Sequence, residues 1–205
     1  MKLVALMARH GETEENAKGV FRSLSNPPLD KKGIRQANEA GRFLKRFKIT
    51  LIVASPLKRS QQTAKVAADY LHSPVETDGR LRGWNVGILI GAKRTQATEA
   101  YRDWYVAHPD KVIPKGESIN QGEERFGGVL QEAIAYGDNG LALLETHGSG
   151  IKFAKSILTG KRTNKGDAEL VQPGGIAGVF REGNKYVVKA LFKPETGREA
   201  SDQVW

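Results

Sequence analysis

The sequence predicts an α/β protein: a three-layer α/β/α sandwich in which helices cover both faces of a mostly parallel sheet. Short apolar runs, beginning with residues 3–8, have the pattern of strands that are buried on both faces. These runs alternate with segments whose apolar residues recur at helical spacing, as in folds built on a parallel sheet. Near the end of the chain, two extended segments flank the turn Glu182-Gly183-Asn184, which predicts a C-terminal hairpin.

In the first half of the chain, the pattern predicts two helices among short strands. Asp30 can cap the first helix, which runs to about residue 47 and places Ile34 on its apolar face. Ser55-Pro56 begins the second helix, whose inward face is rich in alanine. The polar stretch 11–28 shows no periodicity and is predicted to be a loop. The strands are predicted at residues 3–8, 50–54 and 75–77.

The second half adds three helices and the remaining strands, after a glycine-rich stretch that ends at Gly91. Helices are predicted over residues 95–106, 118–136 and 148–158, and strands over 141–145, 176–181 and 186–192. Because the last dozen residues are polar, we expect a single domain over residues 1–192, followed by a polar tail over 193–205.

The composition limits the chemistry that is available to the protein. The 205 residues contain no cysteine, which excludes disulfides, a thiolate nucleophile and cysteine-ligated metals. The apolar runs fall far short of the roughly 20 residues of a transmembrane helix, and no signal peptide is recognised. We therefore expect a cytoplasmic protein without a membrane partner. The formal net charge of +9 fits nucleic-acid binding, an anionic substrate or a basic solubilising surface.

Histidine and arginine residues follow three of the predicted strands. Arg9 and His10 come directly after the first strand, Arg59 follows the second, and His147 follows the strand at 141–145. Ligands of open α/β sheets bind outside the carboxyl ends of the strands, so we expect these side chains to form one pocket. Two guanidinium groups and two imidazoles suit a phosphoryl group, and the first turn of the helix near Arg59 offers free backbone N–H groups. Taken singly, each residue has an ordinary explanation as a buried histidine or a surface charge.

The motifs around these residues resemble the histidine phosphatase superfamily, in its phosphoglycerate mutase-like branch. Arg9-His10-Gly11-Glu12-Thr13 with Asn16 matches the family signature almost letter for letter. Further blocks follow in the family's order: Pro28-Leu29 with Gly33 and Gln36-Ala37, Ser55-Pro56-Leu57 with Arg59 and Thr63-Ala64, Pro114 with Gly116-Glu117-Ser118 and Arg125, and Thr146-His147-Gly148. The resemblance covers most of the chain and implies a phosphoglycerate mutase-like fold.

The resemblance also implies a role for each matching residue. His10 would attack phosphorus and form a phosphohistidine intermediate, which divides one difficult displacement into two easier ones. Arg9 and Arg59 would hold the phosphoryl oxygens, with His147 as a further donor. No metal and no organic cofactor are implied. Further contacts to phosphate or substrate are expected from Thr13, Asn16, Arg22 and Glu117.

One position departs from the family pattern. Members of this branch usually carry a glutamate two residues after the leucine of a Leu-Arg-Glu block, where it protonates the leaving alcohol, but here the block reads Leu81-Arg82-Gly83-Trp84. General acid catalysis contributes about 10²–10⁴-fold to the rate. Either the substrate has a leaving group that needs no proton, or another carboxylate substitutes, or the protein is a weakened or inactive relative that binds phosphorylated ligands.

Three glutamates are candidates for a substitute acid. Glu145 shares a strand face with His147, while Glu12 and Glu117 lie near the motifs. A solvated residue at the end of a strand is the more ordinary interpretation of Glu145.

The remaining charged and aromatic residues have weaker assignments. Arg22 can enlarge an anion site, and so can a basic group that a solvated helix face explains more simply: Lys152, Lys155, Lys161, Arg162 and Lys165. The other two histidines, His72 and His108, are expected at the surface. Three aromatic residues can line a specificity pocket, although packing in the core is the usual place for such side chains: Trp84, Tyr101 and Trp104.

The sequence therefore predicts a phosphatase that acts on a small phosphorylated metabolite through His10. The chain is short and lacks an obvious insertion to enclose a bisphosphate, which favours a phosphatase over a mutase. The alternatives are a phospho-ligand-binding relative with little or no catalysis, motivated by Gly83, and phosphoglycerate mutase-type phosphotransfer. Nucleic-acid binding rests on charge alone. Nothing in the sequence excludes a homodimer.

Overall fold

The computed structural model describes residues 1–161, 170 and 172–195, and its centre is a six-stranded sheet in the order β3-β2-β4-β1-β5-β6. Strands β1 to β4 run parallel, while β5 pairs antiparallel with both β1 and β6. The mostly parallel sheet and the C-terminal hairpin are thus confirmed. The strands are β1 (Lys2–Arg9), β2 (Leu51–Ala54), β3 (Val75–Thr77), β4 (Ala142–Thr146), β5 (Ile176–Glu182) and β6 (Lys185–Phe192).

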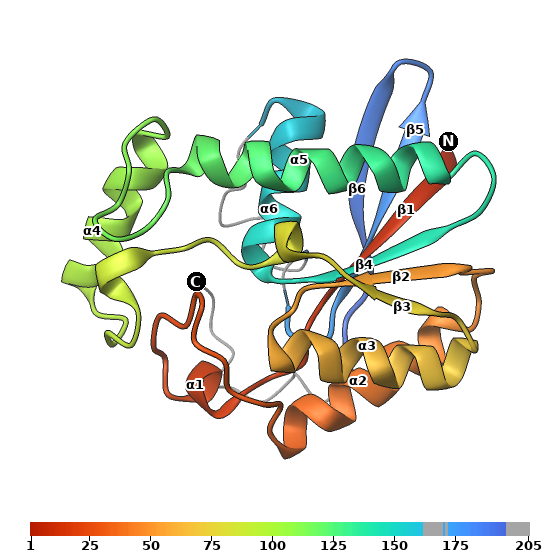
Figure 1. Ribbon diagram of the computed structural model, residues 1–205, viewed down its shortest axis with the longest axis horizontal. Helices are drawn as coiled ribbons and strands as arrows, with labels where there is room; N and C mark the ends of the chain where they lie inside the picture. Colours follow the sequence, from red (N-terminus) through yellow and green to blue (C-terminus); the bar gives the residue numbers. More distant parts are fainter. Residues whose placement is uncertain (162–169, 171, 196–205) are drawn as a thin grey trace.

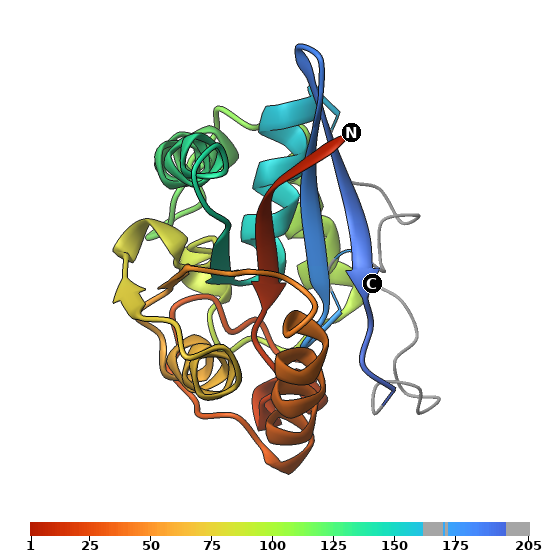
Figure 2. The same ribbon diagram turned by 90° about the vertical axis from the view of Figure 1, so that its right-hand side faces the viewer.

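Helices cover both faces of this sheet, as Figures 1 and 2 show: α5 and α6 pack on one face, and α2 and α3 on the other. The α-helices are α1 (Glu14–Ala17), α2 (Lys31–Leu44), α3 (Lys58–Leu71), α4 (Gln96–Ala107), α5 (Ile119–Tyr136) and α6 (Gly148–Thr159). Two short 3₁₀ helices, η1 (Gly79–Leu81) and η2 (Gly87–Leu89), lie in the glycine-rich stretch. In the described part of the chain, no helix is long and apolar enough to span a bilayer.

Successive side chains of the central strands point to opposite faces of the sheet, which divides the hydrophobic core into two halves. Leu6 of β1 and Leu143 of β4 face α2 and α3, whereas Met7 and Leu144 face α5 and α6. All four side chains are fully buried. This two-sided burial explains why the strands read as continuous apolar runs rather than as alternating ones.

Several local predictions are corrected by the structure. The expected loop at 11–28 contains the short helix α1, because Thr13 and Asn16 form a reciprocal capping box. Helix α3 begins at Lys58, later than Ser55-Pro56 predicts, because Leu57 is still extended. Ile34 is 46% exposed, so it does not lie on the inward face of α2. That face consists of Leu44, Gln36 and four small residues: Gly33, Ala37, Ala40 and Gly41.

The aromatic residues divide between the core and the surface. Trp84 is buried, in keeping with the usual place of such residues. Tyr101 and Trp104 are 37% and 48% exposed, because α4 buries none of its residues against the rest of the protein. Both exposed histidines, His72 and His108, agree with their expected place at the surface. Residues 196–205 of the expected polar tail lie outside the described residues.

Candidate active site

Strand order brings the first residues of the site together. β4 lies between β1 and β2 and runs parallel to both, so all three strands end at the same edge of the sheet. Backbone bonds continue this register beyond the strands: His10 N donates to Thr146 O at 3.1 Å, and Ser55 N to Glu145 O at 3.0 Å. The segments that carry His10, Arg59 and His147 therefore begin side by side.

Arg59 connects the two histidines of the site. Its Nε donates to His10 Nε2 at 3.1 Å, and its Nη2 lies 3.4 Å from His147 Nδ1. The two imidazole rings meet edge to face, with centroids 5.1 Å apart. All three side chains are at most 4% exposed. The structure thus gathers three of the four principal residues that the sequence singles out, and Arg9 stands beside them at the end of β1.

The hydrogen bonds fix which ring nitrogens carry protons. His10 Nδ1 lies 2.6 Å from the Gly11 carbonyl oxygen, which can only accept, so Nδ1 carries the proton and Nε2 presents its lone pair to Arg59. A guanidinium group can only donate, so His147 Nδ1 is also an acceptor. His147 Nε2 then donates to Ser55 Oγ at 2.9 Å. Both histidines are neutral in this arrangement.

The surroundings keep both histidines neutral. Burial lowers the pKa of His10 and that of His147 well below the ordinary value, and the nearby charges of Arg59, Arg22 and Arg9 lower both pKa values further. Burial also lowers the pKa of Arg59, to about 10, so that its guanidinium remains charged at neutral pH. The site therefore combines two uncharged imidazoles with fixed positive charge.

Arg22 adds a third guanidinium to this cluster of arginines and histidines. Burial lowers its pKa, and so do the charges of Arg9, Arg59 and Arg94, while Glu15 has the opposite effect. Its Nε is buried without a hydrogen-bond partner among the described residues, and its Nη1 is 3.4 Å from Thr13 Oγ1. A buried donor among cations is costly unless an anion accepts from it, so Arg22 fits the predicted phosphate contact.

Thr13 and Asn16, expected as phosphate donors, bond chiefly to each other. Asn16 Oδ1 accepts from Thr13 N and from Thr13 Oγ1, both at 3.1 Å, and Asn16 N donates to Thr13 Oγ1 at 3.4 Å. In this arrangement they cap α1 and fix the loop after His10. Whether they also contact phosphate stays a prediction.

One backbone N–H group at the helix start near Arg59 is already satisfied by a side chain. Lys58 N donates to Asn26 Oδ1 at 2.6 Å, so a side chain already satisfies an N–H group that the sequence leaves open. The Arg59 side chain also donates to two carbonyl oxygens, those of Ser23 at 2.9 Å and Ser25 at 2.6 Å. The loop over residues 23–26 therefore holds this helix start and Arg59 in place.

Gly83 lies against His147, where the family resemblance implies a glutamate. A Cβ atom at this position would be 3.4 Å from His147 Cγ and 3.6 Å from Ser149 Oγ, which are ordinary contacts. Its φ is not in the left-handed region. A side chain at position 83 would thus begin beside His147 without meeting backbone.

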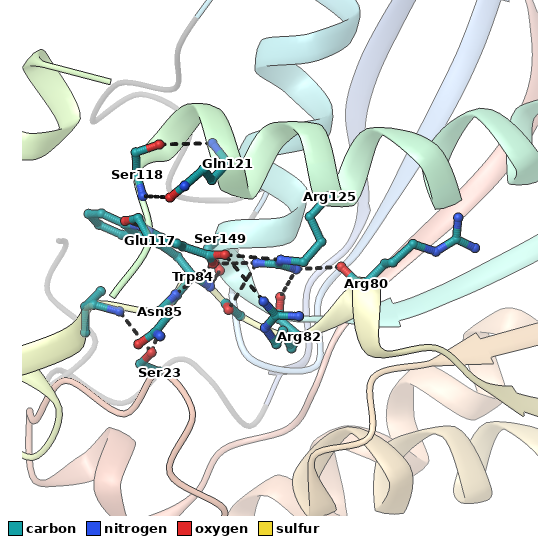
Figure 3. Close-up of polar contacts among 12 residues, drawn as sticks. Ser23, Arg80, Arg82, Trp84, Asn85, Glu117, Ser118, Gln121, Arg125 and Ser149 are labelled. Carbon is teal, nitrogen blue, oxygen red and sulfur yellow. Dashed lines mark hydrogen bonds and ion pairs between the residues drawn. The ribbon is translucent and has the colours of Figure 1, made fainter. Parts of the chain in front are cut away.

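The segment that carries Gly83 is held by a network of polar contacts, drawn in Figure 3. Arg125 donates to the carbonyl oxygens of Arg80 at 2.6 Å and Arg82 at 3.0 Å, and its guanidinium also pairs with Glu117 at 2.5 Å. Trp84 N donates to Ser149 Oγ at 2.9 Å. The backbone at position 83 is therefore fixed from several sides.

Two of the three candidate glutamates are held by basic side chains. Glu117 is bound by Arg125 and by Asn85 N, and Arg82 lies 3.6 Å from its carboxylate. These contacts tie Glu117 to the network, and a contact from Glu117 to substrate stays a prediction. Glu12 pairs with Lys32 at 3.4 Å.

Glu145 is fully buried, which corrects the expectation of a solvated residue. It sits opposite Ala8 on β1 and Ala54 on β2, whose small side chains leave room for it in the middle of the sheet. Within the described part of the chain, neither of its carboxylate oxygens has a hydrogen-bond partner. Burial alone raises its pKa well above the ordinary value, because burial disfavours the charged form of the carboxyl.

Sequence reasoning missed several supporting residues. Ser55 Oγ orients His147, and Thr63 Oγ1 accepts from Gly11 N at 3.2 Å. Ser55 and Thr63 stand inside recognised motifs, so their position was a usable signal. The backbone carbonyl groups that hold Arg59 carry no side-chain signal in the sequence.

The basic residues in and after α6 differ in exposure. Lys155 is half-buried and Lys152 and Lys161 are exposed, while Arg162 and Lys165 lie outside the described residues.

The described residues do not include three acidic or histidine side chains grouped as metal ligands would be.

A family of known proteins matches nearly the whole chain. The model of the histidine phosphatase superfamily (branch 1) matches residues 5–193.

Two curated relatives illustrate the range of names among similar chains. The uncharacterized phosphatase PhoE of Bacillus subtilis (strain 168) is 30% identical over 164 residues, which cover 80% of this chain and 79% of that protein. The probable phosphoglycerate mutase GpmB of Proteus mirabilis (strain HI4320) is 34% identical over 163 residues, covering 77% and 75%.

Solved structures show the same fold. The product of the open reading frame Rv3214 from Mycobacterium tuberculosis superposes with a TM-score of 0.77 at 25% identity, covering 91% of this chain and 95% of that one. A mycobacterial glucosyl-3-phosphoglycerate phosphatase gives a TM-score of 0.76 at 22% identity, covering 91% and 96%. At 22% identity, the similarity to this phosphatase shows the fold alone.

Proposed function

Because this chain belongs to the histidine phosphatase superfamily, whose members include phosphatases and mutases, we propose that it hydrolyses a small phosphate monoester through a phosphohistidine on His10. One observation carries the proposal: a neutral imidazole presents the Nε2 lone pair to Arg59, with Arg9 and Arg22 also close enough to lower its pKa. This is the arrangement that nucleophilic attack on a phosphoryl group requires.

The proposed reaction has two displacements. In the first, His10 Nε2 attacks phosphorus, a P–N bond forms, and the P–O bond to the leaving group breaks with its electron pair on oxygen. The Arg59 Nε–H, released from His10, then donates to a phosphoryl oxygen instead. In the second, water attacks phosphorus and the P–N bond breaks. Inorganic phosphate leaves, and the Nε2 lone pair is restored.

The leaving oxygen receives no proton from a side chain at position 83. Glu145 is buried without a polar contact in the described structure, and Glu117 and Glu12 are engaged elsewhere. We therefore propose that the preferred substrate has a leaving group that departs with little protonation, such as an aryl or acyl phosphate. General acid catalysis would then add little, which is consistent with glycine at this position.

Hydrolysis of 4-nitrophenyl phosphate tests the nucleophile. We expect turnover by the unaltered protein and a loss of at least about 10³-fold in His10→Ala, because the variant removes the proposed nucleophile. His72→Ala is the matched control, since His72 is exposed and should leave the rate unchanged. Equal rates for His10→Ala and the unaltered protein would contradict the proposal.

Gly83→Glu tests the missing acid. On alkyl phosphates, whose leaving groups need a proton, we expect a gain of about 10²-fold in kcat, with little change on 4-nitrophenyl phosphate. Gly83→Gln adds a side chain of the same size without an acidic proton and should give no such gain. An equal effect of both variants, or no gain from glutamate, would show that proton donation at position 83 does not limit the rate.

A second candidate function is binding of phosphorylated ligands without catalysis, which Gly83 favours. That reading predicts tight binding of inorganic phosphate but no turnover of 4-nitrophenyl phosphate between pH 5 and 9. Transfer of the phosphoryl group to a second alcohol instead of water, the mutase alternative, is distinguished by product analysis with labelled acceptor.

A further inference from the structure

Helix α2 and the turn that follows it carry a stripe of positive charge on their outer side. Five exposed cations form this basic stripe: Lys31, Arg35, Arg42, Lys45 and Arg46. The last two continue the helical turn, since Arg46 N donates to Phe43 O at 3.2 Å. At 3.6 residues per turn, the five positions fall within an arc of about 100° and along about 20 Å of the helix axis. Figure 2 shows α2, in orange-red, at the lower edge of the molecule, where the stripe faces solvent.

Little negative charge lies near the basic stripe. Between residues 31 and 48, Glu39 is the only acidic residue, and its Oε2 accepts from Glu195 N at 2.8 Å. In the described part of the chain, none of the five cations forms an ion pair with a carboxylate. Arg46 lies instead over the Phe43 ring, 5.1 Å from its centroid. Exposed lysines elsewhere are more often matched, as Lys65 is by Asp69.

The arrangement of these charges opposes the stability of α2. Lys31 and Arg35 are like charges four residues apart, and so are Arg42 and Arg46, which destabilises a helix. The first turn contains Lys31 and Lys32 but no acidic residue, although the positive end of the helix dipole favours acids there. Mixed signs would keep the surface soluble without these costs. A single stripe of one sign is favourable when it faces an anionic partner.

The geometry of the stripe fits a flat anionic surface better than a nucleic acid. When a helix enters the major groove, its outermost side chains face base edges, whereas the phosphates lie toward its flanks. Here the cations are outermost, and the amide among them is engaged: Asn38 donates to Ile34 O at 2.8 Å and accepts from Tyr70 at 3.2 Å. Phe43, the only aromatic residue of α2, stacks on Phe192, so it is not free to stack on a base. The Ile34 side chain, 46% exposed, adds apolar surface beside the stripe.

We propose that the basic stripe of α2 docks the protein on an anionic lipid membrane, with the charged headgroups as its ligands. Clusters of lysine and arginine on one side of a helix bind anionic lipids in this way, and their long apolar stems suit the interface. The sequence expectation of no membrane partner rests on the lack of a spanning segment, which a protein that lies on the surface does not need.

Docking through this stripe leaves the active site in place. The contacts of α2 with the loop after His10 come from its inward side, through Gly33 and Gln36. The stripe lies on the opposite, outward side. The inference therefore does not depend on the proposed reaction, and the two can fail separately.

Sedimentation with lipid vesicles tests the docking. The probes are vesicles of phosphatidylcholine alone and vesicles of phosphatidylcholine and phosphatidylserine in equal parts. We expect the unaltered protein to bind the anionic vesicles at least about tenfold more tightly, and added salt to release it, because exposed charges are screened. Equal binding to both kinds of vesicle, or binding to neither, would overturn the proposal.

A triple variant locates the binding surface. Arg35→Gln, Arg42→Gln and Lys45→Gln together should weaken binding to anionic vesicles about 10²-fold, because each cation near such a surface contributes about fivefold. The matched control removes the same net charge from three exposed and scattered positions: Lys115→Gln, Lys161→Gln and Lys185→Gln. The control should keep most of the affinity. Equal losses in the two variants would show that overall charge, rather than the stripe, binds the membrane, and would overturn the proposal.

Two other occupants of the stripe are distinguished by further measurements. Tighter binding of duplex DNA than of anionic vesicles, at equal phosphate concentration, would assign the stripe to nucleic acid and overturn the proposal. So would self-association of the unaltered protein that the triple variant loses. Circular dichroism and urea unfolding should show the triple variant folded, since glutamine is a good helix former. Its turnover of 4-nitrophenyl phosphate should equal that of the unaltered protein, so that a loss of docking is not a loss of the active site.

Discussion

His10 is a neutral imidazole whose two ring nitrogens have separate tasks. Nδ1 is anchored by the Gly11 carbonyl, which sets the ring's orientation, and Nε2 keeps its lone pair toward Arg59. Both the burial of the ring and the surrounding arginines disfavour its protonated form. A histidine in such surroundings stays ready to attack at pH values where an exposed histidine would already be protonated.

The lowered pKa of His10 should be visible in pH dependence. We expect the His10 and His147 rings to remain neutral at pH 6, since the pKa of each lies well below the ordinary 6.5. Nitrogen-15 NMR of the imidazole rings measures this directly. The acidic limb of kcat/KM on 4-nitrophenyl phosphate, corrected for ionisation of the substrate, should fall at the same low pH. Titration of His10 at 6.5 or above would contradict the described environment.

At the scale of elements, the N-terminal turn of α2 supports the signature loop. A Cβ atom on Gly33 would lie 2.0 Å from Glu12 O, and one on Gly11 would lie 2.3 Å from Gly33 O. Only two glycines allow these backbones to approach so closely. Gln36, one turn further along α2, accepts from Glu12 N at 2.8 Å. Helix α2 therefore determines where the residues after His10 can lie.

Gly33→Ala should displace this loop. We expect a loss of at least about tenfold in kcat/KM and a destabilisation of about 1–3 kcal/mol, as for overpacking elsewhere. Gly127→Ala is the matched control, because the added Cβ in helix α5 would meet only Ile157 Cδ1 at 3.7 Å. That variant should keep full activity and be more stable by about 0.5–1 kcal/mol. Activity assays and urea unfolding of both variants provide the comparison.

The sequence predicted the elements better than their contacts. Local patterns in the sequence, such as the apolar run at residues 3–8 and the alternation of strands with helices, were enough to predict the fold class and the strand ends. The start of α3 could not be predicted in this way, because Lys58 N is satisfied by Asn26, a residue that is distant from it in the sequence. Glu145 illustrates the same limit: its burial depends on Ala8 and Ala54 in neighbouring strands, and no local pattern reports them.

At the scale of the whole molecule, stability should respond to pH from two directions. His10 and His147 have folded-state pKa values below their unfolded value, so their contribution is complete above pH 6.5 and is lost as pH falls. Glu145 has a folded-state pKa above its unfolded value, so its contribution is present at low pH and is lost as pH rises toward the folded value.

Replacing Glu145 should therefore stabilise the protein, most of all at alkaline pH. We expect Glu145→Leu to raise the free energy of unfolding at pH 8 by about 1–3 kcal/mol, because a buried group without hydrogen bonds is removed. The gain should be smaller at pH 5. Glu145→Gln separates the two causes, since it abolishes titration but keeps a polar group. Urea unfolding at both pH values measures the effect, and a less stable Glu145→Leu at pH 8 would contradict it.

The position of β1 in the sheet has a consequence for how the protein is made. β1 is the first strand of the sheet to leave the ribosome. Both of its neighbours in the sheet, β4 and β5, lie beyond residue 141. The strand that leads into His10 consequently remains unpaired while more than half of the chain is synthesised. A nascent chain that stops after α5 contains His10 and Arg59 but no β4 to align them. The cluster of His10, Arg59 and His147 can thus assemble only late in synthesis, after β4 and His147 have been made.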